Sequence, residues 1–259
     1  MRKNKYTVLF IQNVQDFLIY RTRLFITVLS SFVAPMVMLW ILSGLPNQFV
    51  NGMNKDQLIS YYLTTSILYL FMNSKIDSYV KESIQQGEVA NYLVKPINFW
   101  FVAFVKDVSG RFVKLAFGLP LFAFLIFVYS VPVNFNLSTF DITIIMLTIS
   151  FLLAFSLSFS LGLLAFWVEE VWGLQNVKEV SIVLLSGIAL PYSFFPDILQ
   201  KILVYSPFPY LVNWPLHKGF SGNIFLEFSM AILWLAIFLL SNFLMWKNGI
   251  KKYSALGTY

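Results

Sequence analysis

The chain contains few side chains of the kinds that carry out catalysis. His217 is the only histidine, cysteine is absent, and the twelve acidic residues form no cluster around His217. Hydrolytic or metal-assisted chemistry needs a nucleophile, a base or several ligands close together. No Gly-x-x-x-x-Gly-Lys-Ser/Thr sequence is present, so the chain lacks a P-loop for ATP. We therefore expect no catalytic residue, cofactor site or metal site, and interpret His217 as an interfacial hydrogen-bonding residue.

The composition indicates a membrane protein. Of the 259 residues 58% are apolar and 12% are charged, and the mean hydropathy is +0.73. A soluble domain carries about 25% charged residues. The apolar residues fall in runs near the roughly 20 residues that span a bilayer. We expect an all-α integral membrane protein, one domain over residues 1–259, with six transmembrane helices at residues 24–45, 57–74, 110–131, 142–168, 174–191 and 225–246.

The basic residues predict the orientation of these spans. With the N-terminus inside, 15 of the 18 lysines and arginines lie on the cytoplasmic side, and only Lys55, Lys201 and Lys218 lie outside. Basic residues concentrate in cytoplasmic loops. We therefore expect both termini and Lys95 to be cytoplasmic. The net charge of +6 then reports membrane topology and not nucleic-acid binding.

A polar stretch from Lys75 to Arg111 separates the second and third predicted spans. Its apolar residues recur at nearly helical spacing and are punctuated by a glycine and a proline: Ile84, Gly87, Val89, Leu93, Pro96 and Ile97. A short helix over residues 82–94, parallel to the membrane at its cytoplasmic surface, is suited to docking on a soluble partner. The alternative is an interfacial helix that is merely solvated.

Two other cytoplasmic features accompany this stretch. Residues 4–21 have an apolar helical face, which predicts an interfacial helix or an extension of the first span. Glu169 and Glu170 end the fourth span, either as helix-end anchors or as contacts that help couple a cytoplasmic partner. Arg111 and Lys114, near the cytoplasmic end of the third span, are expected to extend toward the membrane surface.

The outer connection at residues 192–223 is rich in proline and aromatic residues, unlike a solvated loop. We expect a re-entrant segment with a short helix at residues 197–205, which acts either as an outer gate or as a structural plug. The gate residues would be Pro191, Phe194, Phe195, Pro196 and Phe208.

The span cores lack the buried acidic group that proton- or sodium-coupled carriers use. Serines 150, 156, 158 and 160 and Gly162 mark the fourth span as a helix that can approach another closely. Several aromatic residues are candidates to line an apolar cavity: Phe32, Trp40, Phe71, Phe151, Phe155 and Phe159.

The order of these segments resembles the permease subunit of bacterial type-2 ATP-binding-cassette exporters. The pattern Ile-x-x-Gly-x-x-x-x-x-Leu-x-x-Pro is met by Ile84, Gly87, Leu93 and Pro96. The C-terminal run Gly249-Ile-Lys-Lys-Tyr253 is similar to the closing motif of the bacterial branch, and Ser186-Gly187 through Pro191 and Pro196 is similar to its exit from the fifth span. The resemblance covers almost the whole chain.

The resemblance implies a mechanism and partners. Two permease subunits, identical or paralogous, would enclose a path for a lipophilic or amphipathic substrate in the bacterial inner membrane. Separate ATPase subunits would bind ATP and Mg²⁺ and move the coupling helix through Ile84, Gly87, Glu88, Leu93 and Pro96. The alternatives are a self-sufficient secondary transporter or channel and a membrane-embedded lipid enzyme. An ATPase that purifies with the chain would separate these functions.

Overall fold

The computed structural model describes residues 5–19, 21–44, 53–94, 97–129, 140–215 and 222–255, and this part of the chain is helical. His217, Lys218, Lys95 and Pro96 lie outside the described residues. The helices are α1 (Lys5–Ile19), α2 (Arg21–Ser43), α3 (Lys55–Met72), α4 (Ile76–Gln85), α5 (Val89–Val94), α6 (Phe99–Tyr129), α7 (Phe140–Leu163), η2 (Leu164–Phe166), α8 (Trp172–Leu185), η3 (Tyr192–Phe194), α9 (Asp197–Leu203), α10 (Pro209–Val212) and α11 (Ile224–Ala255).

Three helical stretches among the described residues are long and apolar enough to cross a membrane: Phe99–Tyr129, Asp141–Phe166 and Ile224–Lys252. The helices α2, α3 and α8 occupy the other three predicted spans. The outside of the molecule carries large apolar side chains, among them Phe127 at 82% exposure and Phe225 at 79%. Such a surface is typical of a protein that faces lipid or a further subunit.

Several of the helices differ in length from the prediction, and α11 continues to Ala255 instead of ending at residue 246. α8 ends at Leu185 and not at residue 191, because the backbone turns at Gly187, where φ is +85°. α6 begins at Phe99 and not at residue 110. Its first turns are apolar and buried at Phe99, Val102 and Ala103, so they belong to the folded core although they lie beside polar residues.

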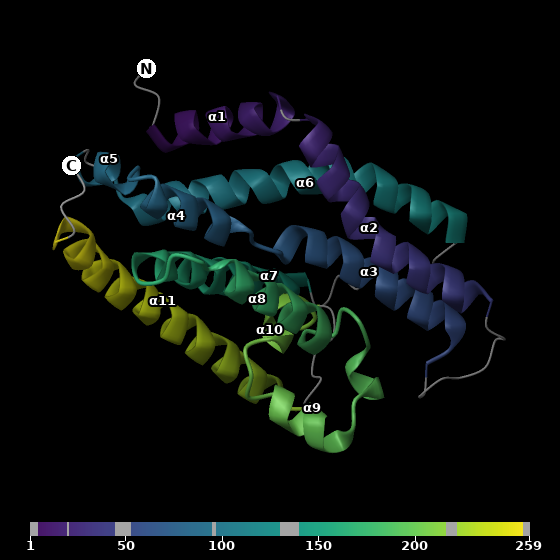
Figure 1. Cartoon of the computed structure of the whole chain (residues 1–259). Coiled ribbons are helices and arrows are strands. Elements are labelled where there is room, and N and C mark those ends of the chain that lie inside the picture. Colours follow the sequence, from purple (N-terminus) through teal and green to yellow (C-terminus); the bar gives the residue numbers. More distant parts are fainter. Residues whose placement is uncertain are drawn as a thin grey trace.

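The elements that contain the polar stretch gather at one end of the molecule. Figure 1 shows α4 and α5 at the same end as the start of α1 and the end of α11, whereas α9 lies away from it. α1 runs alongside the first half of α6, from a Tyr6–Phe101 ring contact to Phe17, which lies over Gly110. α7 is central, since it contacts α3, α4, α6, α10 and α11.

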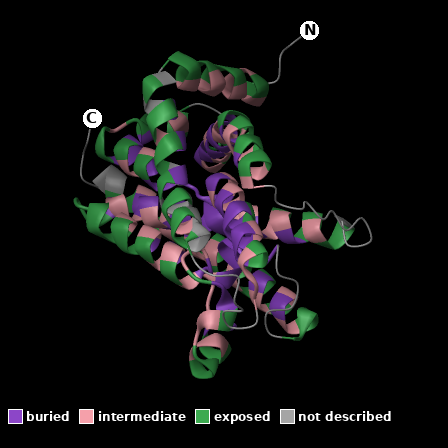
Figure 2. Cartoon of the chain, turned by 90° about the vertical axis from the view of Figure 1, so that its right-hand side faces the viewer, coloured by how far each residue is buried: buried purple, intermediate pink, exposed green. Residues whose placement is uncertain are grey.

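Buried residues occupy the middle of the molecule, where these helices meet (Figure 2). One apolar cluster lies directly beneath α4 and α5 and consists of Ile76, Val80, Ile84, Val89, Phe99, Ala103, Phe155, Phe159, Leu163 and Phe166. Phe155 and Phe159, expected to line a cavity, are instead packed in this cluster, and Trp40 is 76% exposed. The aromatic residues of α7 therefore pack against α4 and α5.

A glycine permits the close contact between α4 and α7. A Cβ on Gly162 would lie 2.6 Å from the Cβ of Val80 and 2.9 Å from the carbonyl oxygen of Asp77. No side chain fits in that space, because carbon atoms in contact are normally about 3.5–4.0 Å apart. The sequence prediction that the fourth span approaches another helix closely is confirmed at this position.

We predict that Gly162→Ala lowers the free energy of unfolding of the detergent-solubilised chain by about 1–3 kcal/mol, the usual cost of overpacking a core. Gly173→Ala on α8 is the matched control, because no atom lies within 4 Å of a Cβ added there. Denaturant titration in mixed micelles measures both variants. Equal stability of the two would contradict the close packing of α4 on α7.

Candidate functional site

The polar stretch folds as a helical hairpin and not as one helix over residues 82–94. α4 ends at Gln85, a turn occupies residues 86–88, and α5 begins at Val89. Gly87 has a φ of +80°, a conformation that glycine adopts without steric cost. The turn at Gly87 therefore separates α4 from α5 and changes the direction of the chain. We call α4, this turn and α5 the coupling hairpin.

One face of the coupling hairpin is buried and the other is free. Ile84 and Val89 pack into the cluster beneath it, as their spacing predicted. Leu93, expected on the same face, is 48% exposed although it lies one helical turn after Val89, because only the first residue of α5 is buried and the helix leads away from the cluster. Glu88 is also exposed, and its carboxylate accepts a bond from the Ser83 hydroxyl at 3.3 Å. Leu93 and Glu88 thus belong to the outward face.

The structure brings Glu169 and Glu170 to the coupling hairpin. The Glu170 carboxylate lies 3.0 Å from Lys81 on α4, and this hydrogen bond lowers the pKa of Glu170. Glu169 contributes its backbone carbonyl, which accepts a bond from Gln85 at 2.5 Å. The loop after η2 is therefore bonded to α4 through the side chain of Glu170 and the main chain of Glu169.

The connection from α3 to α4 is the most heavily bonded part of this region. Arg111 Nη1 donates to the Met72 carbonyl at 3.0 Å, and Lys114 Nζ donates to the Asn73 carbonyl at 3.2 Å. The next carbonyl accepts two bonds, from Lys178 at 3.1 Å and from the Ser158 hydroxyl at 3.0 Å. We call this set the carbonyl clamp. It consists of the three carbonyls of residues 72–74 and the side chains of Arg111, Lys114, Ser158 and Lys178.

The carbonyl clamp is explained by how α3 ends. The last carbonyls of a helix have no partner within it and carry partial negative charge. α3 ends at Met72, which is fully buried, so water cannot satisfy its carbonyl. Cationic side chains from α6 and α8 bind these carbonyls instead, and the guanidinium of Arg111 also stacks 4.0 Å from the centre of the Phe151 ring.

Carboxylates balance the buried cations. Lys178 lies 3.0 Å from Asp77 and 3.2 Å from Glu179, and Arg111 pairs with Asp107. Asp107 also accepts a 2.8 Å bond from the Ser74 hydroxyl, inside the connection itself. Burial raises the pKa of Asp77, and the ammonium of Lys178 opposes that shift. A buried charge is tolerated only when it is paired in this way.

The sequence interpretation missed most of this cluster. Arg111, expected to extend to the membrane surface, is fully buried and bonded to α3, so that expectation is wrong. Two signals were available. Asp107 and Arg111 stand four residues apart on one helical face, and the pair Lys178-Glu179 provides the only charges of α8.

The loop at residues 186–191 and the outer segment that follows it are packed against α3 and α11 over their described part. The hydroxyl of Tyr61 on α3 donates to the Gly187 carbonyl, and that of Tyr62 donates to the Ala189 carbonyl at 3.0 Å. At the other side, Trp234 on α11 donates its indole N–H to the Tyr205 carbonyl at 3.0 Å. α9 ends at Leu203, two residues before the predicted end of the short helix.

The predicted gate residues lie at different places on this segment. Pro191 is buried and Pro196 is exposed, directly before α9. Phe194 packs against the cluster formed by α2 and α3, and Phe208 packs against the cluster formed by α7, α10 and α11. Phe195 contacts the ring of Tyr192 at 5.8 Å between centroids. All three phenylalanines are half-buried, and they do not form a single cluster.

Comparison with known proteins identifies the family of the chain. A search of curated proteins found no match. The family model described as ABC-2 family transporter protein matches residues 25–257, which include the coupling hairpin, the carbonyl clamp and the outer segment. Because this match covers nearly the whole chain, the protein belongs to the ABC-2 transporter family and is a permease subunit of an ATP-binding-cassette transporter.

Proposed function

We propose that the chain is the permease subunit of an ATP-driven exporter whose translocation path carries a lipophilic or amphipathic substrate. A separate ATPase would bind ATP and Mg²⁺ and dock on the exposed face of the coupling hairpin. The outer segment, bonded to α3 through Asn213 and to α11 through the Tyr205 carbonyl, would act as the gate on the opposite side. Family membership and the free outward face of the hairpin support this assignment.

The observation that carries the proposal is the carbonyl clamp. It joins the connection between α3 and α4 to α6, α7 and α8. A force applied to α4 by a partner therefore reaches four long helices at once. Gly162 adds direct contact between α4 and α7, so α4 has little freedom to move alone.

The orientation and assembly are part of the same proposal. The distribution of basic residues supports cytoplasmic termini and a cytoplasmic coupling hairpin in a multi-pass protein of the bacterial inner membrane. A second permease subunit, either a copy of this chain or a paralogue, would complete the path. The large apolar side chains exposed on α2, α6 and α11 support burial against lipid and such a subunit.

The sequence disfavours a secondary carrier, because the cores of its predicted spans lack acidic residues. The structure nevertheless contains buried carboxylates. Asp77, Asp107 and Glu227 are buried. Each nevertheless has a partner: Asp77 and Asp107 pair with cations, and Glu227 accepts the Trp214 indole N–H at 3.1 Å. We therefore interpret these carboxylates as parts of the folded core and retain the ATP-driven function.

Reversing the charge of Glu88 on the hairpin surface tests the ATPase contact. We predict that Glu88→Arg lowers the ATPase activity of the co-purified complex about tenfold, equivalent to about 1.4 kcal/mol of lost interaction. Asp197→Arg on α9, also exposed, is the matched control and should retain activity. If Glu88→Arg is fully expressed, co-purifies with the ATPase and has normal ATPase activity, Glu88 does not contact the ATPase.

The carbonyl clamp is tested by comparing two lysines with equally short ion pairs. Lys178→Met leaves Asp77 buried without its cation and should cost about 3–5 kcal/mol of unfolding free energy. Lys81→Met breaks a pair at the same 3.0 Å distance whose Glu170 side chain is 76% exposed, and should leave the unfolding free energy nearly unchanged because solvent screens that pair. Denaturant titration in mixed micelles compares them.

Adding Asp77→Asn to Lys178→Met should recover part of the loss, because the uncompensated charge is removed. If the two substitutions are instead additive, Asp77 and Lys178 do not act as a pair in the folded chain.

The gate is tested at Phe208. We predict that Phe208→Ser weakens packing on the cluster around α7, α10 and α11 by about 1 kcal/mol, since the side chain is half-buried, and so raises ATP hydrolysis that is not coupled to transport. Ile198→Ser on α9 is the control, since that side chain is 75% exposed. Hydrolysis by the complex reconstituted in liposomes measures both. Unchanged coupling in Phe208→Ser would show that the segment is a plug.

A further inference from the structure

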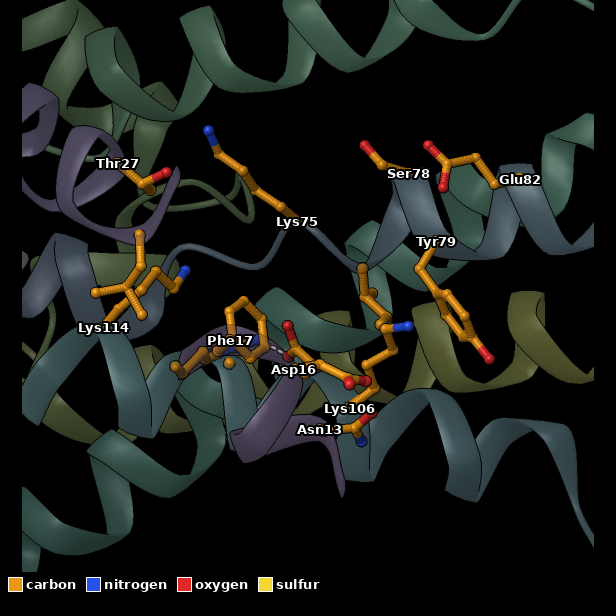
Figure 3. A pocket seen from close by; sticks show the side chains of 15 residues that line it. Asn13, Asp16, Phe17, Thr27, Lys75, Ser78, Tyr79, Glu82, Lys106 and Lys114 are labelled. Carbon is orange, nitrogen blue, oxygen red and sulfur yellow. Dashed lines mark ion pairs between the residues drawn. The ribbon is translucent and has the colours of Figure 1, made fainter. Parts of the chain in front are cut away.

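A cavity of about 350 Å³ lies between α1, α2, α4 and α6, beside the carbonyl clamp. Figure 3 shows its lining, with Thr27 and Lys114 on one side, Tyr79 on the other, and Phe17 between them. Asp107 and Arg111, already paired with each other, form part of the wall. The ATPase contact proposed above does not use this space.

A smaller cavity of about 150 Å³ adjoins the first. It is lined by residues of α2, α3 and α6 and shares Thr27, Lys75 and Lys114 with the larger one. Lys75 and Lys114 therefore stand where the two spaces meet. Together the cavities form an elongated site that reaches from α1 and α4 toward the spans.

The lining carries lysine side chains that can form further hydrogen bonds or ion pairs. Among the described residues, Lys75 has no ion pair or hydrogen bond, and Lys106 has no ion pair, although its ammonium lies 3.8 Å from the centre of the Tyr79 ring. Lys114 makes one bond, to the Asn73 carbonyl, and an ammonium has three donors. These lysines can donate to a further acceptor.

The carboxylates of the lining do not cancel these cations. Four cations, Lys75, Lys106, Arg111 and Lys114, face Asp16, Glu82 and Asp107. Asp107 is bound by Arg111 and the Ser74 hydroxyl, whereas Asp16, Glu82 and Lys75 are exposed and can turn toward water. The enclosed part of the site, with Lys106, Arg111 and Lys114 against Asp107, is therefore electropositive, and it suits an anion with several acceptor oxygens.

The surroundings of the site are apolar. Phe17 and Leu24 line the cavity, and neighbouring side chains on α1 and α2, such as Leu18 and Phe25, are exposed at 48% and 60%. An acyl chain could lie along this surface while its headgroup occupied the cavity. We propose that the site binds a phosphate group and that the source is an anionic lipid headgroup.

The position of Lys75 gives this site a connection to the coupling hairpin. Lys75 is the residue directly before α4 and follows the carbonyls held by the clamp. A phosphate bound by Lys75 and Lys106 would link the start of α4 to α6 and α1. This inference does not depend on the identity of the ATPase or of the transported substrate.

Native mass spectrometry of the purified full chain tests the proposal with phosphatidylglycerol, phosphatidylcholine and inorganic phosphate as separate probes. We expect a saturable adduct with phosphatidylglycerol that is tighter than the adduct with phosphatidylcholine. The double variant Lys75→Gln, Lys106→Gln should weaken it at least about tenfold, since each charge-assisted bond lost is worth about that factor.

The double variant Lys55→Gln, Lys201→Gln is the matched control, because it removes the same net charge outside the cavity. Its affinity for phosphatidylglycerol should stay unchanged. Lys75→Arg, Lys106→Arg should retain binding and shows that a loss is due to charge and not to misfolding. If inorganic phosphate competes at the same affinity as the lipid, the phosphate site stands and a soluble ligand is its source. Equal lipid binding by the glutamine variant and the control overturns the proposal.

Discussion

The buried end of α3 is the constraint on which the rest of this structure depends. A helix that stops inside a protein leaves carbonyl groups that water cannot reach, and each unsatisfied group is costly. Here the chain does not bend toward solvent after Met72 but continues to α4, so the carbonyls of residues 72–74 need side-chain donors. Arg111, Lys114, Ser158 and Lys178 supply them, and the carboxylates of Asp77, Asp107 and Glu179 neutralise the cations.

This solution has a mechanical consequence. Mobile connections between helices are usually weakly bonded, whereas this one is held by side chains from three other helices. The coupling hairpin is thereby joined to the spans as well as packed on them through Gly162 and the apolar cluster beneath Ile84 and Val89. A permease driven by an external ATPase needs such a connection, because the energy enters at the hairpin and must open a path elsewhere.

The sequence predicted the features that depend on local pattern. Apolar runs predicted where long helices lie, and Asp197 began the short outer helix. The sequence predicted one helix over residues 82–94 and not the turn at Gly87 that separates α4 from α5. It did not predict the carbonyl clamp, because Asp77 and Lys178 are 101 residues apart and meet only through tertiary packing. Leu93 was misassigned for a related reason: its spacing from Val89 is helical, but only the first residue of α5 packs on the core, and the local pattern does not reveal this.

The central claim is that α4 and the spans move as one body. Pulsed electron paramagnetic resonance between spin labels at Glu82 on α4 and Thr148 on α7 tests it most directly, because both side chains are exposed. The measurement uses the complex with its ATPase, with and without ATP, and labelled chains diluted by unlabelled ones. Rigid coupling predicts the same distance distribution in both states while ATP is hydrolysed. A shift of that distribution on ATP binding would show that the hairpin moves against α7 and would contradict the account.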